Sequence, residues 1–171
     1  MWGLLVFLVA AVSSGEVIDS SESGFTSRNS MQVSAPPDAV YGALVDKVHE
    51  WWDADHRYTG DSTNLSIEAE AGGCFCENLP DNPNGSSVQH MEVVYVEPGT
   101  SLRIRGGLGP LQAMGVTGAM TFDLEASGDG TQITLTYAVG GYSPGEGGLG
   151  SLAEVVVRGQ LESLVTYVDA P

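Results

Sequence analysis

The sequence predicts an α+β fold, in which a curved antiparallel sheet of about six to seven strands wraps around one long C-terminal helix. Several short segments in the middle of the chain alternate apolar and polar residues, the pattern of strands with one buried face. From Leu149 onward the apolar residues change to helical spacing over about 18 to 20 residues. An antiparallel sheet with one apolar face needs a cover, and this helix is the only expected element long enough to provide it.

The N-terminal residues predict export. An apolar run from Leu4 to Val12 has the length of a signal-peptide core and is too short to span a bilayer. Small residues follow it, but no Lys or Arg precedes it, so a buried N-terminal strand is the alternative. We expect a signal peptide over residues 1–14, an acidic flexible tail over 15–23 and one domain over 24–171. The mature protein is then periplasmic or secreted.

Two short helices are expected after the first strand. Alternation predicts that strand over Phe25–Val33, and the following Pro36 and Pro37 suit the first turn of a helix. A second short helix is expected around residues 49–53.

The other strands and turns follow in order. Alternating residues predict strands near 65–67, 74–78, 88–96, 102–104, 120–125 and 133–139. Residues 79–85 form a loop, residues 106–115 form a Gly-rich connection, and Gly128-Asp129-Gly130 is a strong hairpin signal. We expect Arg103 and Arg105 to point away from the core and to pair with surface carboxylates.

The charge of the chain limits its partners. It has 22 acidic residues against six Lys and Arg, a formal net charge of −16. Such a surface repels nucleic-acid phosphates and anionic membranes. We therefore expect no nucleic-acid partner and no stable membrane insertion.

Several motifs resemble a known superfamily. The stretch from Ala35 to Tyr41, with the later tryptophan pair, resembles the first helices of START-like, helix-grip proteins, the SRPBCC superfamily. Residues 72–77, Gly-Gly-Cys-Phe-Cys-Glu, are similar to a strand of the branch named for the activator of Hsp90 ATPase, and 109–112, 116–118 and 134–137 are similar to it too. The resemblance covers about residues 25–168.

This resemblance implies a cavity between the sheet and the long helix, commonly for apolar ligands. Members of the superfamily include carriers, cyclases and dehydratases, and co-chaperone domains. They share no universal catalytic motif, so the resemblance implies no active-site residue and no cofactor.

The two cysteines leave three interpretations open. Residues i and i+2 of a regular strand lie roughly 6.5 Å apart, which suits a disulfide poorly unless the strand bends, as Gly72-Gly73 would allow. If Cys76 pairs with His90 across the hairpin, Cys74, Cys76 and His90 share one face and suit zinc or copper. A one-residue change of register moves His90 to the other face. Disulfide or redox pair, metal ligands and inert thiols all remain possible.

The expected function is an exported binding protein that holds a small apolar or amphipathic molecule, oriented by His90 or Tyr137. Trp51 and Trp52 lie either at the pocket mouth or in the core. The full set of pocket candidates is Trp51, Trp52, Cys74, Cys76, His90, Met114, Met120, Phe122, Tyr137, Leu152 and Val156.

Two alternative functions stay open. A cyclase or dehydratase would use His and Asp as acid–base groups, and His56 lies between Asp55 and Arg57. An interaction module of the Hsp90-activator type is the other, and export argues against it. No nucleophile elbow, phosphate loop or metalloprotease motif occurs. We expect no catalytic residue, no cofactor and no bound metal, and the sequence does not indicate the oligomeric state.

Overall fold

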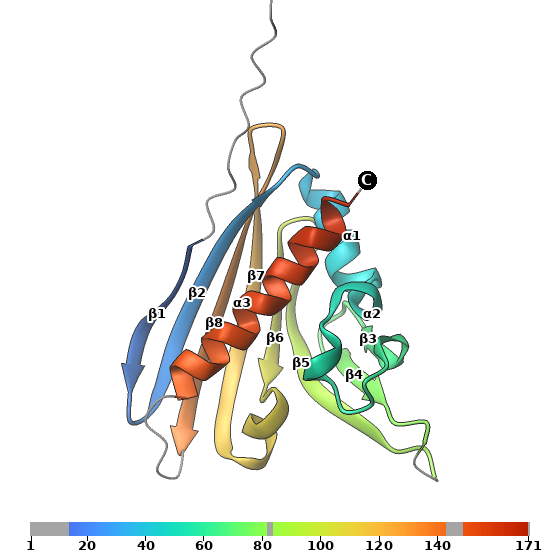
Figure 1. Ribbon diagram of the computed structural model, residues 1–171, viewed down its shortest axis with the longest axis vertical. Coiled ribbons are helices and arrows are strands. Elements are labelled where there is room, and N and C mark those ends of the chain that lie inside the picture. The colour runs from blue at the N-terminus through green and yellow to red at the C-terminus, as the bar shows by residue number, and fades with distance from the viewer. Residues whose placement is uncertain (1–13, 82–83, 143–148, 171) are drawn as a thin grey trace, which may run out of the picture.

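The described part of the protein, residues 14–81, 84–142 and 149–170 of a computed structural model, is organised around an eight-stranded antiparallel sheet (Figure 1). The spatial order of its strands is β1-β2-β8-β7-β6-β5-β4-β3. The strands are β1 (Ser14–Ser21), β2 (Gly24–Val33), β3 (Leu65–Ile67), β4 (Cys74–Asn78), β5 (Ser87–Glu97), β6 (Ser101–Gly106), β7 (Gly115–Ser127) and β8 (Gly130–Tyr142). The predicted α+β class is confirmed.

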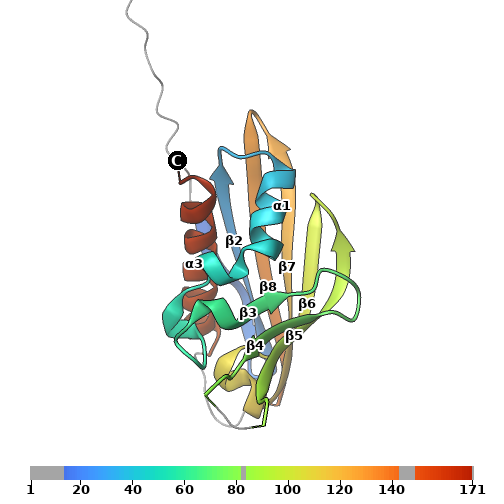
Figure 2. The same ribbon diagram turned by 90° about the vertical axis from the view of Figure 1, so that its right-hand side faces the viewer.

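The helices lie close to the positions that helical spacing and the proline pair predicted. Helix α1 (Pro37–Asp46) begins on a proline, α2 (Val48–Trp51) follows, and α3 (Leu149–Val168) has 20 residues. The described residues also form three short 3-10 helices: η1 (Ala54–His56), η2 (Ser62–Asn64) and η3 (Gly109–Ala113). Both α1 and α3 lie on the same side of the sheet (Figure 2). The predicted helix grip is therefore confirmed.

One apolar core joins the sheet to α3. Val157, Leu161 and Leu164 of α3 are each at most 1 % exposed and belong to the same core cluster as Ile133 and Leu135 of β8. The two-residue turn Gly128–Asp129 joins β7 to β8, as predicted, with Ser127 paired to Gly130. The long β7–β8 ladder lies near the middle of the sheet, and α3 lies closest to the neighbouring strand β2 and to the edge strand β1.

The structure differs from the expected tail at residues 15–23. Ser14–Ser21 form β1, which pairs along the edge of β2. Its side chains are mostly exposed, so β1 is held to β2 by backbone hydrogen bonds. Because no face of β1 is buried, its sequence does not alternate between apolar and polar residues. The expected signal peptide lies, apart from Ser14, outside the described residues.

Two further segments also differ. The connection expected over 106–115 includes the turn η3, and β7 and β8 extend beyond the alternating residues that predicted them. Arg103 and Arg105 do point outward, but Arg103 donates to the Thr121 hydroxyl and stacks over the Tyr95 ring instead of meeting a carboxylate. Among the described helices, none is both long and apolar enough to cross a membrane.

Candidate functional site

A cavity of about 630 Å³ lies between the sheet and the first turns of α3. Four parts of the chain line it: the segment after α2, strand β5, the η3 region, and β8 with α3. Most of the wall is apolar, through Trp52, Leu108, Pro110, Leu111, Met114, Leu152, Ala153, Val156 and Val157. The volume suits a molecule of ordinary small-ligand size.

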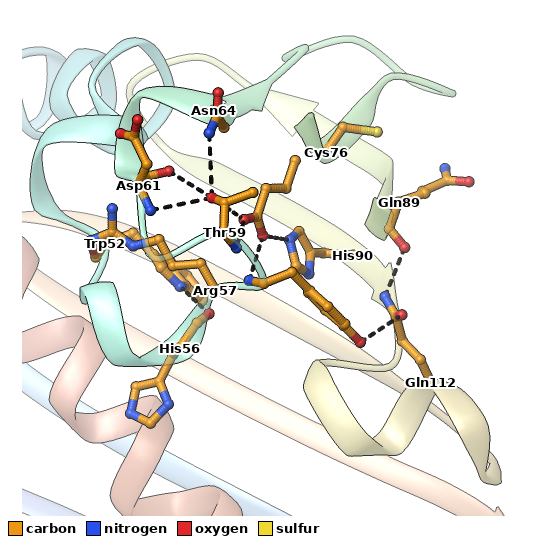
Figure 3. A network of polar contacts seen from close by, with 12 residues as sticks. Trp52, His56, Arg57, Thr59, Asp61, Asn64, Cys76, Gln89, His90 and Gln112 are labelled. Carbon is orange, nitrogen blue, oxygen red and sulfur yellow. Dashed lines mark hydrogen bonds and ion pairs between the residues drawn. The ribbon is translucent and has the colours of Figure 1, made fainter. Parts of the chain in front are cut away.

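The mouth of the cavity is marked by exposed side chains. Leu152 of α3 is 67 % exposed and Tyr58 is 56 % exposed, and both belong to the cavity wall. The Tyr58 hydroxyl donates to Gln112 across the opening, at 3.4 Å (Figure 3). Exposed Asp55 and His56 also line this end. The cavity therefore opens to solvent on one side.

Six of the eleven pocket candidates lie in the cavity wall: Trp52, His90, Met114, Tyr137, Leu152 and Val156. Trp51, Met120 and Phe122 instead pack in the core, where the sheet meets the helices. Trp51 donates its indole N–H to the Ala43 carbonyl, while Trp52 donates to the His56 carbonyl and presents its ring to the cavity. The tryptophan pair is thus divided between core and pocket.

A buried hydrogen-bonded pair forms the polar end of the cavity. The imidazole Nε2 of His90 lies 3.1 Å from Oε2 of Glu77, and the two residues are 4 % and 0 % exposed. His90 belongs to the cavity wall but Glu77 does not, so the carboxylate supports the ring from behind. None of the hydrogen bonds among the described residues uses Nδ1 of His90.

The Glu77 carboxylate is held by a connected network (Figure 3). The backbone N–H groups of Tyr58 and Thr59 donate to it at 3.0 and 2.7 Å, and the Thr59 hydroxyl donates at 2.7 Å. Asp61 N–H and the Asn64 amide donate in turn to the Thr59 hydroxyl. The loop after η1 is therefore wrapped around one buried carboxylate.

These contacts set the charge states of the pair. Burial alone would raise the pKa of Glu77, but hydrogen bonds from Thr59, Tyr58 and His90 outweigh burial and hold the pKa below its usual 4.5. Burial lowers the pKa of His90 below 6.5, against the opposing effect of Glu77. At neutral pH the pair is a carboxylate and a neutral imidazole. Because Nε2–H donates to Glu77, Nδ1 carries the lone pair.

A β-bulge turns His90 toward the cavity. Phe75 pairs with Met91 and Cys76 pairs with Gln89, so His90 is the extra residue in β5. His90 and Met91 are consequently both buried, which breaks the alternation of the strand. The cysteines lie on the opposite face of β4 from Phe75 and Glu77. The register that would have put His90 beside both cysteines does not occur.

The cysteines form a disulfide, one of the three open interpretations. Cys74 and Cys76 are bonded to each other, with their Cα atoms 5.3 Å apart. This spacing is shorter than that of a regular strand, and it falls where the register between β4 and β5 changes. Neither cysteine lines the cavity. No group of three or more candidate metal-binding side chains occurs in the part of the chain that the structure describes.

Tyr137 supplies a second polar group. Its side chain is 1 % exposed, lines the cavity and packs edge-on against Phe25. The ring lies close over Gly118 of β7, where an added Cβ would come within 2.5 Å of it. No contact of the hydroxyl with the described residues has full hydrogen-bond geometry, although the Leu108 backbone lies close enough to act on its pKa. Burial raises the pKa of Tyr137 to about 12, partly offset by the Leu108 backbone, so the hydroxyl stays protonated.

Sequence reasoning missed several residues of the site. Glu77 shares the inward face of β4 with Phe75, and an acid at such a position is a signal of a buried pair. Arg57 donates to the Trp52 and Asp53 carbonyls and so shapes the rim. Tyr58 and Arg57 come from a loop, whose position no periodic pattern indicates.

Several solved structures share this fold. A protein from Rhizobium leguminosarum is 14 % identical, with a TM-score of 0.62, over 92 % of this chain and 97 % of that one. CalU16 from Micromonospora echinospora is 17 % identical, with a TM-score of 0.56, over 93 % and 86 %. The Aha1 dimer from Colwellia psychrerythraea is 16 % identical, with a TM-score of 0.54, over 83 % and 94 %.

Sequence comparison gives the family. No curated protein matches the chain. The family model described as "Polyketide cyclase / dehydrase and lipid transport" matches residues 25–169, nearly all of the described domain. With its curved antiparallel sheet around α3 and its START-like structural neighbours, the chain belongs to the polyketide cyclase/dehydrase and lipid-transport family of helix-grip proteins.

Proposed function

We propose that the protein binds a small apolar or amphipathic molecule in the cavity beneath α3. The observation that carries this proposal is the cavity itself, about 630 Å³ with a largely apolar wall that opens to solvent at Tyr58 and Leu152. Burial of apolar ligand surface there contributes roughly 25 cal/mol per Å². The family description, which includes lipid transport, is consistent with it.

The polar end of the cavity suits one chemical group in particular. Nδ1 of His90 offers a lone pair, and Glu77 fixes the tautomer that does so. Tyr137 lines the same cavity, with its protonated hydroxyl buried beneath the wall. An apolar ligand with one hydroxyl group would donate its hydroxyl proton to Nδ1 of His90 and bury its apolar part against the cavity wall. An anionic group has no proton to donate, and its charge would be repelled by the lone pair of Nδ1.

The test compares two naphthalene probes and two tryptophan variants. We expect 2-naphthol to bind, and to bind about fivefold more tightly than 2-methoxynaphthalene, because the ether has no hydroxyl proton for His90. Ala153→Trp, which fills the cavity wall, should abolish binding of both probes. The matched control Ala126→Trp lies on an exposed part of β7 away from the lining and should bind normally. Equal binding by wild type and Ala153→Trp in calorimetric titrations would refute the proposal.

Export belongs to the same proposal. The apolar run from Leu4 to Val12 supports it. The Cys74–Cys76 disulfide supports it too, because structural disulfides persist mainly in oxidising compartments. Sequencing the N-terminus of protein recovered from the native host would test it: a start near residue 15 is expected, and an intact Met1 in the cytosolic fraction would contradict export.

One observation favours a second function, acid–base catalysis of the cyclase or dehydratase sort. His90 lies in the cavity wall with a carboxylate behind it, an arrangement that can accept a proton from a bound molecule. The carboxylate is Glu77 and not one of the expected aspartates. The test is whether the molecule that copurifies with the protein is converted by wild type and left unchanged by His90→Gln.

A further inference from the structure

The Cys74–Cys76 disulfide closes over a single residue, Phe75. The two Cα atoms lie 5.3 Å apart, whereas residues i and i+2 of a regular strand lie roughly 6.5 Å apart. Strand β4 is therefore shortened at this point. Both cysteines are half-buried on the face of the strand that points away from the cavity, so their sulfur atoms do not belong to the pocket.

The shortened segment coincides with the bulge that holds His90. The β4–β5 register changes between Phe75 and Cys76, and His90 is the residue left over on the partner strand. If the register of Phe75 with Met91 simply continued, Cys76 would pair with His90. Because a shift of one residue reverses the face of a side chain, His90 would then lie on the outer face with the cysteines.

The inner neighbours of Cys76 are the two residues that fix His90. The Phe75 ring lies 5.0 Å from the imidazole, centroid to centroid, and the Glu77 carboxylate lies 3.1 Å from Nε2. The disulfide on one face and the His90 contacts on the other thus alternate along four consecutive residues, Cys74–Glu77. A change in the geometry of this segment must move at least one of those contacts.

We propose that the Cys74–Cys76 disulfide is a thiol-exchange site that controls whether His90 faces the cavity. With the disulfide closed, the bulge holds His90 inward, as in this structure. With the disulfide reduced, β4 relaxes toward regular spacing, and His90 leaves Glu77 and the cavity. The expected loss of ligand affinity rests on the proposed function. The expected movement of His90 is independent of that function.

The reaction partner is a dithiol. Its thiolate attacks one sulfur of the disulfide to give a mixed disulfide, and its second thiol then releases the chain. Two S–H groups form on Cys74 and Cys76, one S–S bond forms in the dithiol, and two electrons pass to the chain. Reoxidation by a disulfide of the same class restores the bond.

The experiment compares oxidised protein with protein treated with dithiothreitol. Reduction should weaken binding of 2-naphthol about fivefold, the scale of one lost hydrogen bond, and leave 2-methoxynaphthalene unaffected. The imidazole NMR signals of His90, assigned by their loss in His90→Gln, should shift on reduction, while those of exposed His56 should not. In the control Cys74→Ser/Cys76→Ser, 2-naphthol should bind weakly with or without dithiothreitol.

Every result of this experiment either supports or overturns the control of His90 by the disulfide. Thiol counting establishes when the wild type is reduced, so the wild type alone suffices if the double variant fails to fold. Unchanged His90 signals in the reduced protein would overturn the proposal, as would a disulfide that opens only on global unfolding. If the oxidised protein binds neither probe, the proposed function fails, and the His90 signals still decide whether the disulfide controls the bulge.

Discussion

His90 and Tyr137 are both polar, both almost fully buried and both part of the same cavity wall, yet their surroundings differ sharply. His90 is bound to a carboxylate that itself accepts three further hydrogen bonds. The Tyr137 hydroxyl has no partner among the described residues. The comparison indicates that one group is held by a network while the other is buried with its hydrogen-bonding capacity unused. A ligand therefore meets a rigid acceptor at His90, and the Tyr137 hydroxyl oxygen lies beneath the cavity surface.

The largest effect should come from removing the support of His90. Glu77→Ala leaves the N–H groups of Tyr58 and Thr59, the Thr59 hydroxyl and His90 without their acceptor. A buried donor left without its acceptor costs about 1–3 kcal/mol, so we expect the free energy of unfolding in urea to fall by at least about 2 kcal/mol. Binding of 2-naphthol should fall too, because the His90 tautomer is no longer fixed.

Glu92→Ala is the matched control. Glu92 lies on the neighbouring strand β5 with an exposed side chain, and its loss should change the free energy of unfolding by less than about 0.5 kcal/mol. A Glu77→Ala protein as stable as Glu92→Ala would show that the buried carboxylate does not organise the loop. The contrast between His90 and Tyr137 would then lose its basis.

The pair should also make stability depend on acid. The folded pKa of His90 lies below the 6.5 of the unfolded chain, so the unfolded state binds more protons as pH falls through 6.5. Stability should therefore be lost from pH 6.5 down to the folded pKa, by up to about 1.4 kcal/mol per pH unit. Glu77, whose pKa is lowered below 4.5, adds a second loss in the same direction below pH 4.5.

Urea titrations across this range, on wild type and His90→Gln, measure the effect. The variant should lack the loss that begins at pH 6.5 and keep the one that begins at 4.5. Affinity for 2-naphthol should fall with pH in the wild type, because protonated Nδ1 becomes a donor and no longer accepts the hydroxyl proton. Identical pH profiles for the two proteins would contradict the assignment of His90.

The same comparison explains what the sequence could and could not predict. Tyr137 lies in a long alternating segment, so its inward direction followed from periodicity alone. His90 lies at a bulge, and a bulge changes direction by one residue without leaving a pattern in the sequence. The fold was predictable because the alternation of strands and the spacing of helices persist over many residues. Strand β1 was missed because its exposed polar residues pair with β2 only through the backbone.

The site was predictable to the extent that it rests on such long patterns. Met114, Leu152 and Val156 were expected in the cavity wall and lie there. Glu77 was missed because its role depends on a loop that folds over it from 18 and 19 residues away in the sequence. The loop is held in place by hydrogen bonds to one carboxylate. The secondary-structure propensities of its own residues do not indicate that position.

The smallest effect, and the opposite sign, should come from Tyr137→Phe. The hydroxyl is buried without a partner among the described residues, so removing it deletes an unsatisfied polar group and keeps the ring against Phe25. We expect the free energy of unfolding to rise by about 1 kcal/mol. Tyr95→Phe, which removes an exposed hydroxyl bonded to Glu97, is the control and should change stability by less than about 0.5 kcal/mol. A Tyr137→Phe protein that is less stable than wild type would mean that the buried hydroxyl contributes to the fold.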